Sequence, residues 1–300
     1  MRLFTLIISF ISAFSAGCQP VNHDRSVDIF YKVFGEGSPI LIINGGPGMN
    51  SEGFASIADS ISKLGFQTII YDQRGTGRSV MKNIGASTIT MELMADDMEW
   101  IRKRMKIDKW ILFGHSFGGI MATYYAHKYP HHVEKIIFSS SGGVDLSFRN
   151  NFAQRISKNL TKIEKDSLDY FQQKINSGDS SSQTRYDRAR FLANAYVFDK
   201  KNSELIARRL IRINWDINNL VFEDLEKINY DFDQKFNNFH QPVLILQGLN
   251  DVISMETAQK INKTFHHSKL VLLEHCGHYG WLDSREKYMN SIKDFLSDGK

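Results

Sequence analysis

The feature that most constrains the fold is a glycine-rich turn at residues 114–119, which have the sequence GHSFGG. An apolar run at 110–113 precedes the turn, and a stretch of helical character follows it. Glycines on both sides of Ser116 are needed where a strand turns sharply into a helix, because larger side chains would clash with the crowded backbone. The pattern therefore predicts a buried strand, a tight turn that carries Ser116, and a helix that begins near Phe117.

Such a turn points the serine hydroxyl out of the sheet, beside the free backbone N–H groups at the start of the helix. These N–H groups and the positive end of the helix would stabilise an oxyanion. Ser116 is therefore a candidate nucleophile. The alternative is a solvated serine in an ordinary glycine-rich turn.

A serine nucleophile needs a histidine base and an acid that orients the histidine. Residues 242–247 predict a buried strand, and Asp251 lies in the loop after it. Residues 269–273 predict the next strand, which His278 follows. Because the carboxyl ends of parallel strands meet at one edge of a sheet, we expect Ser116, Asp251 and His278 to meet there.

Other residues in these loops compete for the two roles. For the base, the alternative is His275, but a glycine directly before His278 lets the loop turn back over the site. For the acid, the alternatives are Glu274 and Asp283. We expect His115, although it is adjacent to the serine, to point away from the cleft.

An oxyanion hole needs a second backbone donor, from the loop after an earlier strand. Residues 39–43 predict that strand, and the following loop at 44–48 has the sequence NGGPG. Its glycines allow the backbone to approach a substrate carbonyl closely. We therefore assign the oxyanion hole to the backbone N–H groups of Gly46 and Phe117.

A further loop at 72–79, with the sequence DQRGTGRS, follows a strand predicted at 68–71. Its Asp72 and Arg74 are residue types that catalysis uses. An acid and a guanidinium this close in sequence more often pair with each other. We expect these two residues to form a structural brace beneath the site.

The turn at 114–119, the glycine loop at 44–48 and the DQRG sequence at 72–75 together resemble the α/β-hydrolases, and among them the proline iminopeptidase family. The resemblance covers residues 26–143 and 240–298. It implies an α/β fold, with a mostly parallel sheet flanked by helices and an inserted helical cap. It also implies a serine hydrolase without metal or organic cofactor. In the peptidase members the substrate is the N-terminal residue of a small peptide.

The sequence departs from the family pattern at three places. Asn44 stands where the loop usually begins with histidine, and Phe117 where tryptophan is common. Leu249 and Asn250 precede Asp251, where related peptidases can carry an acid. The family peptidases hold the α-ammonium group of the substrate with carboxylates, so the acid for that role has to be sought elsewhere in this chain.

Glycine becomes rare in the second half of the chain. Gly178 is the only glycine between Val144 and Gln247. Several amphipathic segments within this stretch predict helices. We expect a helical cap at 144–238, inserted into a catalytic domain at 26–143 and 239–300. The cap would cover the cleft and select the substrate. Its candidate substrate-binding residues are four acids for an α-ammonium group and one aromatic residue for an apolar wall: Glu204, Asp216, Glu223, Asp224 and Trp215.

The charge pattern narrows the class of partner. The formal net charge is +4, and the sequence has no long basic run, so we expect no nucleic-acid partner. Its cysteines and histidines lack the spacing of a zinc site, and we expect no metal. The expected partner is a small-molecule or short-peptide substrate. The sequence does not determine the oligomeric state.

The first 17 residues are typical of an export signal, with Arg2 followed by an apolar stretch at 3–14 and small residues at 15–17. Cys18 comes next, as in bacterial lipoprotein signals, where that cysteine is lipidated and becomes the mature N-terminus. We therefore expect a bacterial envelope protein, anchored to the membrane through lipid on Cys18. Ordinary signal cleavage, giving a periplasmic or secreted protein, is the alternative.

These features predict a serine hydrolase that works through an acyl-enzyme. The first hypothesis is an aminopeptidase that releases N-terminal proline or another small residue from peptides. The second is a carboxylesterase or other small-acyl hydrolase. The third is a lipid-anchored binding protein without catalysis.

Overall fold

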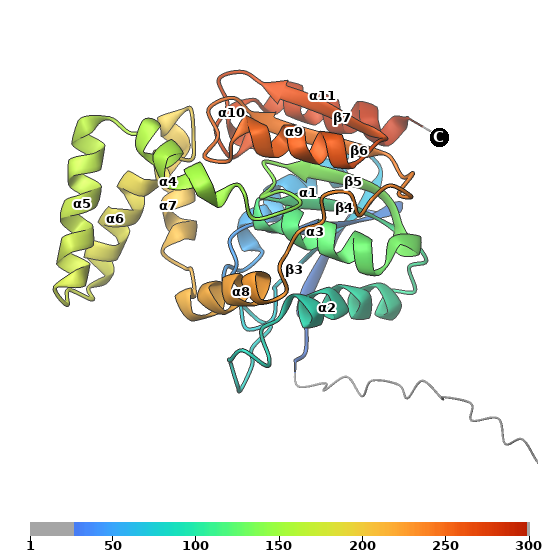
Figure 1. The fold of residues 1–300 in the computed structure, drawn as a ribbon, viewed down its shortest axis with the longest axis horizontal. Coiled ribbons are helices and arrows are strands. Elements are labelled where there is room, and N and C mark those ends of the chain that lie inside the picture. Colours follow the sequence, from blue (N-terminus) through green and yellow to red (C-terminus); the bar gives the residue numbers. More distant parts are fainter. Residues whose placement is uncertain (1–26, 299–300) are drawn as a thin grey trace, which may run out of the picture.

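The computed structural model describes residues 27–298. A seven-stranded sheet forms its centre, in the order β1-β3-β2-β4-β5-β6-β7 (Figure 1). β1 pairs with β3 in the antiparallel direction, and every other neighbouring pair is parallel. The predicted fold class, a mostly parallel sheet flanked by helices, is confirmed.

The strands are short, and those in the middle of the sheet are apolar on both faces. In β2, Leu41 and Ile43 pack into one core, whereas Ile40 and Ile42 pack into the other. This alternation follows from the period of two along a strand, and burial of both faces is usual in parallel sheets. The strands are β1 (Tyr31–Phe34), β2 (Ser38–Ile43), β3 (Phe66–Tyr71), β4 (Trp110–His115), β5 (Val133–Ser139), β6 (Val243–Gly248) and β7 (Ser268–Leu273).

Helices cover both faces of the sheet (Figure 1). On one face lie α2 (Met91–Arg104), α3 (Phe117–Lys128) and α9 (Met255–Thr264), whose apolar residues share one core. On the other face lie α1 (Ala55–Ser62) and α11 (Arg285–Ser297). The short elements are η1 (Glu52–Phe54), η2 (Pro130–His132) and α10 (Gly280–Asp283).

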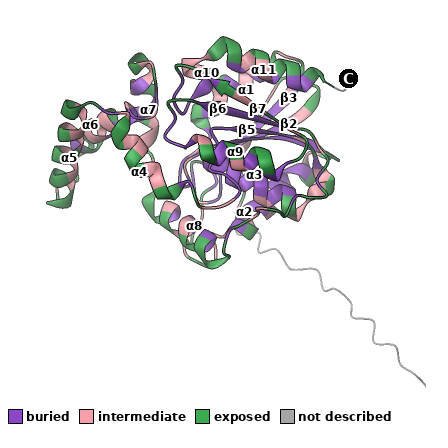
Figure 2. Cartoon of the chain, turned by 45° about the horizontal axis from the view of Figure 1, so that its top comes forward, coloured by how far each residue is buried: buried purple, intermediate pink, exposed green. Residues whose placement is uncertain are grey.

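The chain between β5 and β6 forms a run of helices, which we call the β5–β6 insert. Figure 1 shows α5 and α6 standing away from the sheet, and Figure 2 shows few buried residues on them. No residue of α5 is buried, so this helix is held by its neighbour α6 and by a capping box of Thr161 and Glu164. The helices are α4 (Arg149–Lys158), α5 (Lys162–Asn176), α6 (Ser182–Ala193), η3 (Lys200–Asn202), α7 (Ser203–Leu210) and α8 (Trp215–Lys227).

The predicted pairing of Asp72 with Arg74 is wrong. Nε and Nη2 of Arg74 donate to the two carboxylate oxygens of Asp97 on α2, each at 2.7 Å. The Asp72 carboxylate accepts from the backbone N and the Oγ of Ser51 at 2.8 Å, and from the backbone N of Arg78 at 2.9 Å. Both side chains brace the loops beneath the site, but each has its own partners.

The predicted export signal at 1–17 and the predicted lipidation site Cys18 lie outside the described residues. Both stay predictions. Within residues 27–298, no helix combines the length and the apolar character that crossing a bilayer requires.

Candidate active site

Ser116 lies at the sharp turn between β4 and α3. Its backbone has φ 55° and ψ −120°, outside the helical and extended regions, a conformation that costs about 1–3 kcal/mol. Its N–H donates to the carbonyl of Ser139 at 3.0 Å, which ties the turn to β5. Gly118 has no room for a side chain, because a Cβ there would lie 2.0 Å from the carbonyl oxygen of Ile43. The glycine pattern of the turn therefore has a steric cause.

His278 and Asp251 form a buried pair. Nδ1 of His278 donates to Oδ1 of Asp251 at 2.7 Å, and their side chains are 4% and 0% exposed. The carboxylate also accepts from the backbone N of Ile253 at 2.9 Å and from Nε2 of Gln247 at 3.0 Å. These donors fix the carboxylate. Because Nδ1 carries the proton toward the acid, Nε2 of His278 is left as an acceptor.

Ser116 and His278 line one cavity of about 580 Å³. Asp251 lies directly behind the histidine. The structure thus brings together three residues that follow β4, β6 and β7, at one edge of the sheet. Among the described residues, Ser116 Oγ makes no hydrogen bond, so its hydroxyl can turn toward a bound group.

The alternative base and acids lie elsewhere. His275 is exposed, and its ring packs on that of Phe198 at a centroid distance of 5.1 Å. Glu274 is exposed as well. Asp283 accepts from the backbone N of Gly277 at 2.9 Å, and so holds the loop that carries the buried histidine.

The loop after β2 approaches Ser116 closely, since a Cβ on Gly45 would lie 2.6 Å from Ser116 Cβ. Gly46 has φ 74°, in the left-handed region that favours glycine. Within residues 27–298, neither the N–H of Gly46 nor that of Phe117 donates to a protein acceptor. Phe117 is the first residue of α3, where the positive end of the helix lies. Two unused donors therefore flank the serine.

The β5–β6 insert donates hydrogen bonds to, or accepts them from, three of the loops around the serine. The backbone N of His278 donates to the carbonyl of Tyr196 at 2.7 Å. Nε of Arg155 donates to the carbonyl of Asp251 at 2.8 Å. Nδ2 of Asn218 donates to a carbonyl of the loop after β2 at 3.0 Å. The insert therefore helps to position both loops that carry the buried pair.

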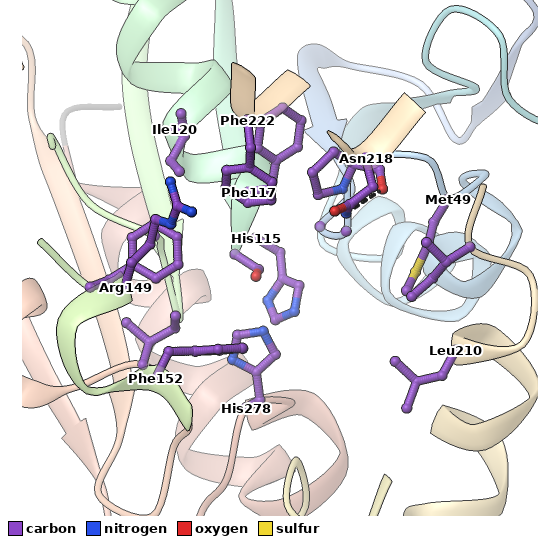
Figure 3. Close-up of a pocket in the computed structure, with 18 of the residues that line it drawn as sticks. Met49, His115, Phe117, Ile120, Arg149, Phe152, Leu210, Asn218, Phe222 and His278 are labelled. Atoms are coloured by element: carbon purple, nitrogen blue, oxygen red, sulfur yellow. Dashed lines mark hydrogen bonds between the residues drawn. The ribbon is translucent and has the colours of Figure 1, made fainter. Parts of the chain in front are cut away.

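The cavity walls come from both the sheet edge and the insert. In Figure 3, Phe222 of α8 lies on the side opposite His278, and Met49 and Leu210 lie on the side away from Arg149. Apolar side chains make up most of the lining.

Helix α8 turns one face to the cavity, and the lining residues recur at helical spacing. They are Trp215, Asn218, Asn219, Phe222, Glu223 and Glu226. Two predicted substrate-binding residues, Glu223 and Trp215, thus lie at the cavity, although Trp215 is 54% exposed. Glu226, which forms an ion pair with Arg149, was not among the residues predicted from the sequence. Its spacing of three residues from Glu223 is the signal that would have found it.

The structure does not place Glu204, Asp216 or Asp224 at the cavity. Glu204 forms an ion pair with Arg208 at 2.8 Å. Asp216 is exposed in the first turn of α8. Asp224 is buried and accepts from the backbone N of Met91 at 2.7 Å, which fixes the start of α2. These acids share helices with lining residues but lie on other faces of them.

His115 lines the cavity, contrary to expectation. Its ring lies 4.6 Å from the ring of His278 and 5.1 Å from that of Tyr279, measured between centroids. Burial, followed by electrostatic repulsion from His278 when that ring is protonated and from Arg209, lowers the pKa of His115 well below that of an ordinary histidine. The imidazole beneath His278 is therefore neutral at neutral pH.

This neutral histidine predicts a pH-dependent stability. The unfolded chain protonates His115 near the ordinary pKa of about 6.5, whereas the folded chain does not, so the unfolded state binds more protons below that pH. The contribution to stability is present above about pH 6.5 and is lost as the pH falls. We expect His115→Phe to remove a slope of up to about 1.4 kcal/mol per pH unit from the unfolding free energy.

Urea unfolding of the two proteins at about pH 7, 6 and 5 measures this difference. Wild-type protein and the variant should converge in slope above about pH 7. If the unfolding free energies of wild type and His115→Phe changed with pH by the same slope across pH 7, 6 and 5, the assignment of a neutral His115 would be contradicted.

Cys276, two residues before His278, is a buried free thiol. Burial raises the pKa of this thiol, so it is a poor competing nucleophile. In the part of the chain that the structure describes, no three residues of His, Cys, Asp or Glu type are grouped to hold a metal ion.

Comparison with known proteins is consistent with this geometry. Residues 38–284 match the alpha/beta hydrolase fold family. The chain belongs to the α/β-hydrolase family. The family membership makes it a hydrolase, and the third hypothesis, a binding protein without catalysis, is not supported.

The proteins to which this α/β-hydrolase is similar include peptidases and, by fold, an esterase. The proline iminopeptidase of Saccharolobus solfataricus is 27% identical and covers 90% of this chain and 89% of its own. A solved proline iminopeptidase from Mycobacterium smegmatis has a TM-score of 0.71 at 17% identity, covering 91% of this chain and 95% of its own. An esterase from Exiguobacterium antarcticum has a TM-score of 0.68 at 18% identity, covering 91% of this chain and 96% of its own. The predicted likeness to proline iminopeptidases is confirmed.

Proposed function

We propose that this α/β-hydrolase is a serine aminopeptidase that releases the N-terminal residue of short peptides. The observation that carries the proposal is the carboxylate of Glu223, which lines the same cavity as Ser116 and His278. Among the described residues Glu223 has no ion-pair partner, whereas the neighbouring Glu226 is paired with Arg149. The likeness to proline iminopeptidases supports the same reading.

In this mechanism Ser116 Oγ attacks the carbonyl carbon of the first residue, and Nε2 of His278 takes the serine proton. Asp251 keeps Nδ1 protonated and stabilises the imidazolium. The N–H groups of Gly46 and Phe117 hold the oxyanion. His278 then protonates the leaving amine. Water, activated by the same histidine, hydrolyses the acyl-enzyme.

The carboxylate of Glu223 would offset the hydration that a substrate α-ammonium group loses on binding. A free α-ammonium group loses hydration when it enters a covered cavity, and it tolerates that loss only where a carboxylate or several acceptors replace the water. Glu223 supplies a negative charge that no protein cation in the described residues neutralises. Trp215 supplies an apolar wall on the same face of α8.

The test compares free and N-acetylated aminoacyl arylamides. We expect the wild-type enzyme to prefer the free amine by roughly tenfold to a hundredfold in kcat/KM, the range of a charge-assisted hydrogen bond. Glu223→Gln should remove most of this preference. The matched control is Asp216→Asn, on the same helix but away from the cavity, which should retain it.

A carboxylesterase is the second candidate, because apolar residues dominate the cavity lining. Phe148, Phe152 and Ile213 are among those that come from the insert. An esterase would cleave short-chain aryl esters and would not discriminate between free and acetylated amines. Cleavage of simple esters without cleavage of aminoacyl arylamides would overturn the aminopeptidase proposal and favour this one.

Location in the bacterial envelope is proposed on the sequence of residues 1–17 and Cys18 alone. A lipid on Cys18 would anchor the enzyme to the membrane. Incorporation of labelled fatty acid, and its loss in Cys18→Ser, distinguishes the lipid anchor from ordinary signal cleavage.

A further inference from the structure

Each backbone carbonyl of the loop after β2, residues 44–49, accepts a hydrogen bond from a protein donor. The backbone N of Met49 donates to the carbonyl of Gly46 at 3.0 Å, which closes a turn within the loop. Nδ2 of Asn44 donates to the carbonyl of Gly45 at 3.3 Å and to that of Met49 at 3.1 Å. Nε2 of Gln73, in the loop after β3, donates to the carbonyl of Asn44 at 3.0 Å.

The other two carbonyls of this loop, those of Pro47 and Gly48, are held by the β5–β6 insert. Nδ2 of Asn218 on α8 donates to the carbonyl of Pro47 at 3.0 Å, the hydrogen bond drawn beside Asn218 in Figure 3. The backbone N of Asn214, directly before α8, donates to the carbonyl of Gly48 at 2.9 Å. A Cβ on Gly48 would lie 2.2 Å from the carbonyl oxygen of Asn214, so the two backbones are in direct contact.

The start of α8 is itself fixed, so it can act as a support. Asn214 and Asn218 are four residues apart, about one helical turn, and both therefore reach the same loop. Oδ1 of Asn214 accepts from the backbone N of Asp216 at 3.1 Å and from that of Ile217 at 3.2 Å, which caps the helix. The side chain of Ile217 is buried in the core that α2 and α3 share. Asn218 thus projects from a capped and packed helix.

The hydrogen bonds of this loop bear on the N–H of Gly46, the proposed oxyanion donor. Residues 45–48 include three glycines, and a glycine-rich backbone has many accessible conformations when nothing holds it. In a planar trans peptide the carbonyl and the following N–H point in opposite directions. Because the Gly45 carbonyl is bonded to Asn44, the N–H of Gly46 is directed away from that amide, and no described residue accepts from it. A donor that is held in place before the reaction stabilises an oxyanion without reorganisation.

We propose that Asn218 is a positioning residue for the oxyanion hole, because it holds the loop that carries the N–H of Gly46. The proposal rests on the serine mechanism of the proposed function, and it applies equally to peptide and ester substrates. Asn218 lines the cavity, but its Nδ2 is bonded to the Pro47 carbonyl. Helix α8 then supports the oxyanion loop through Asn218 and lines the substrate cavity through Glu223.

The first test replaces Asn218 with leucine, which is similar in size but has no donor. We expect kcat to fall about tenfold to a hundredfold with KM within a few-fold of wild type, because a displaced oxyanion donor weakens binding of the transition state alone. Asn218→Asp should lose at least as much, since its carboxylate lacks the donor and would repel the Pro47 carbonyl oxygen. Asn218→Gln keeps an amide N–H, so it should lose less than Asn218→Leu.

Asp216→Leu is the control, because it places a leucine on the same helix but away from the loop and the cavity. This variant should keep the wild-type kcat and KM. Circular dichroism establishes folding, and Asn218→Asp carries the comparison if the leucine variant is unstable. A role of Asn218 in the cavity lining alone predicts a changed KM with an unchanged kcat. That outcome, or wild-type kcat in both Asn218→Leu and Asn218→Asp, would overturn the proposal.

Labelling by a fluorophosphonate separates this inference from the choice of substrate. Ser116 Oγ forms a bond to phosphorus as the bond to fluorine breaks, its proton passes to His278, fluoride leaves, and the phosphoryl oxygen occupies the oxyanion hole. We expect the second-order labelling rate of Asn218→Leu to be about tenfold or more below that of wild type and of Asp216→Leu.

Equal labelling rates for wild type and Asn218→Leu would overturn the role of Asn218, whatever the substrate is. A slower rate in Asn218→Leu, in an enzyme that does not cleave aminoacyl arylamides, would instead refute the aminopeptidase function and retain the positioning role. Wild-type protein that is not labelled would overturn both, because each requires a reactive Ser116.

Discussion

Replacing Ser116 with alanine is expected to abolish hydrolysis, with kcat lowered about 10⁶-fold. The hydroxyl is the proposed nucleophile, and without it the cavity retains only the oxyanion donors and substrate binding. Folding should be unaffected, because Ser116 Oγ makes no hydrogen bond to another described residue. Turnover of an aryl ester or an aminoacyl arylamide measures the loss, and a fluorophosphonate probe should label wild-type protein only.

An exposed serine provides the control for this experiment. Ser177, after α5, is exposed and far from the cavity lining, so Ser177→Ala should be labelled at the wild-type rate. Labelling of the Ser116→Ala protein at that rate would mean that the nucleophile is another residue.

The second large effect concerns the buried pair. His278→Ala and Asp251→Asn should each lower kcat by roughly 10³ to 10⁶, since in the proposed mechanism the base and its orienting acid act with the serine as one unit. Asparagine keeps the shape of the aspartate but removes the charge that stabilises the imidazolium. For the same reason the double variant should be little worse than the more damaging single variant.

Steady-state kinetics of the two single variants and the double variant tests this non-additivity, with circular dichroism to establish that each is folded. His275→Ala is the matched control, because His275 lies in the same loop but is exposed. Losses that multiply, or an equal loss in His275→Ala, would require another assignment of the base.

The sheet edge could be predicted from sequence because its signals are local. The uninterrupted apolar runs of β2 and β4 produce strands that are buried on both faces. Glycine is required at position 118 by the turn itself, because a side chain there would clash with the backbone of β2. Loops that follow parallel strands must meet at one edge, so the positions of Asp251 and His278 followed from strand order alone.

The contacts between distant segments could not be predicted in this way. Helical periodicity shows which residues of α8 share a face, but not which face of the helix is turned toward the cavity. It therefore could not distinguish Glu223, which lines the cavity, from Asp224, which does not. The partner of Asp224 is Met91, which is 133 residues away in sequence. Arg74 likewise pairs with Asp97 on α2 rather than with the acid two residues before it. The position of His115 depends on the rings of His278 and Tyr279, which lie in the loop after β7.

The hydrogen bond from the His278 backbone to Tyr196 has a consequence for how such enzymes diversify. A Cβ on Gly277 would lie 2.6 Å from the carbonyl oxygen of Tyr196, so loop and insert fit each other backbone to backbone at this point. Helices α7 and α8, which contribute Leu210 and Glu223 to the cavity lining, come later in the chain. Exchange of only the segment between Tyr196 and β6 would replace these helices while keeping the support of the histidine. An exchanged segment that includes Tyr196 would require a matching histidine loop.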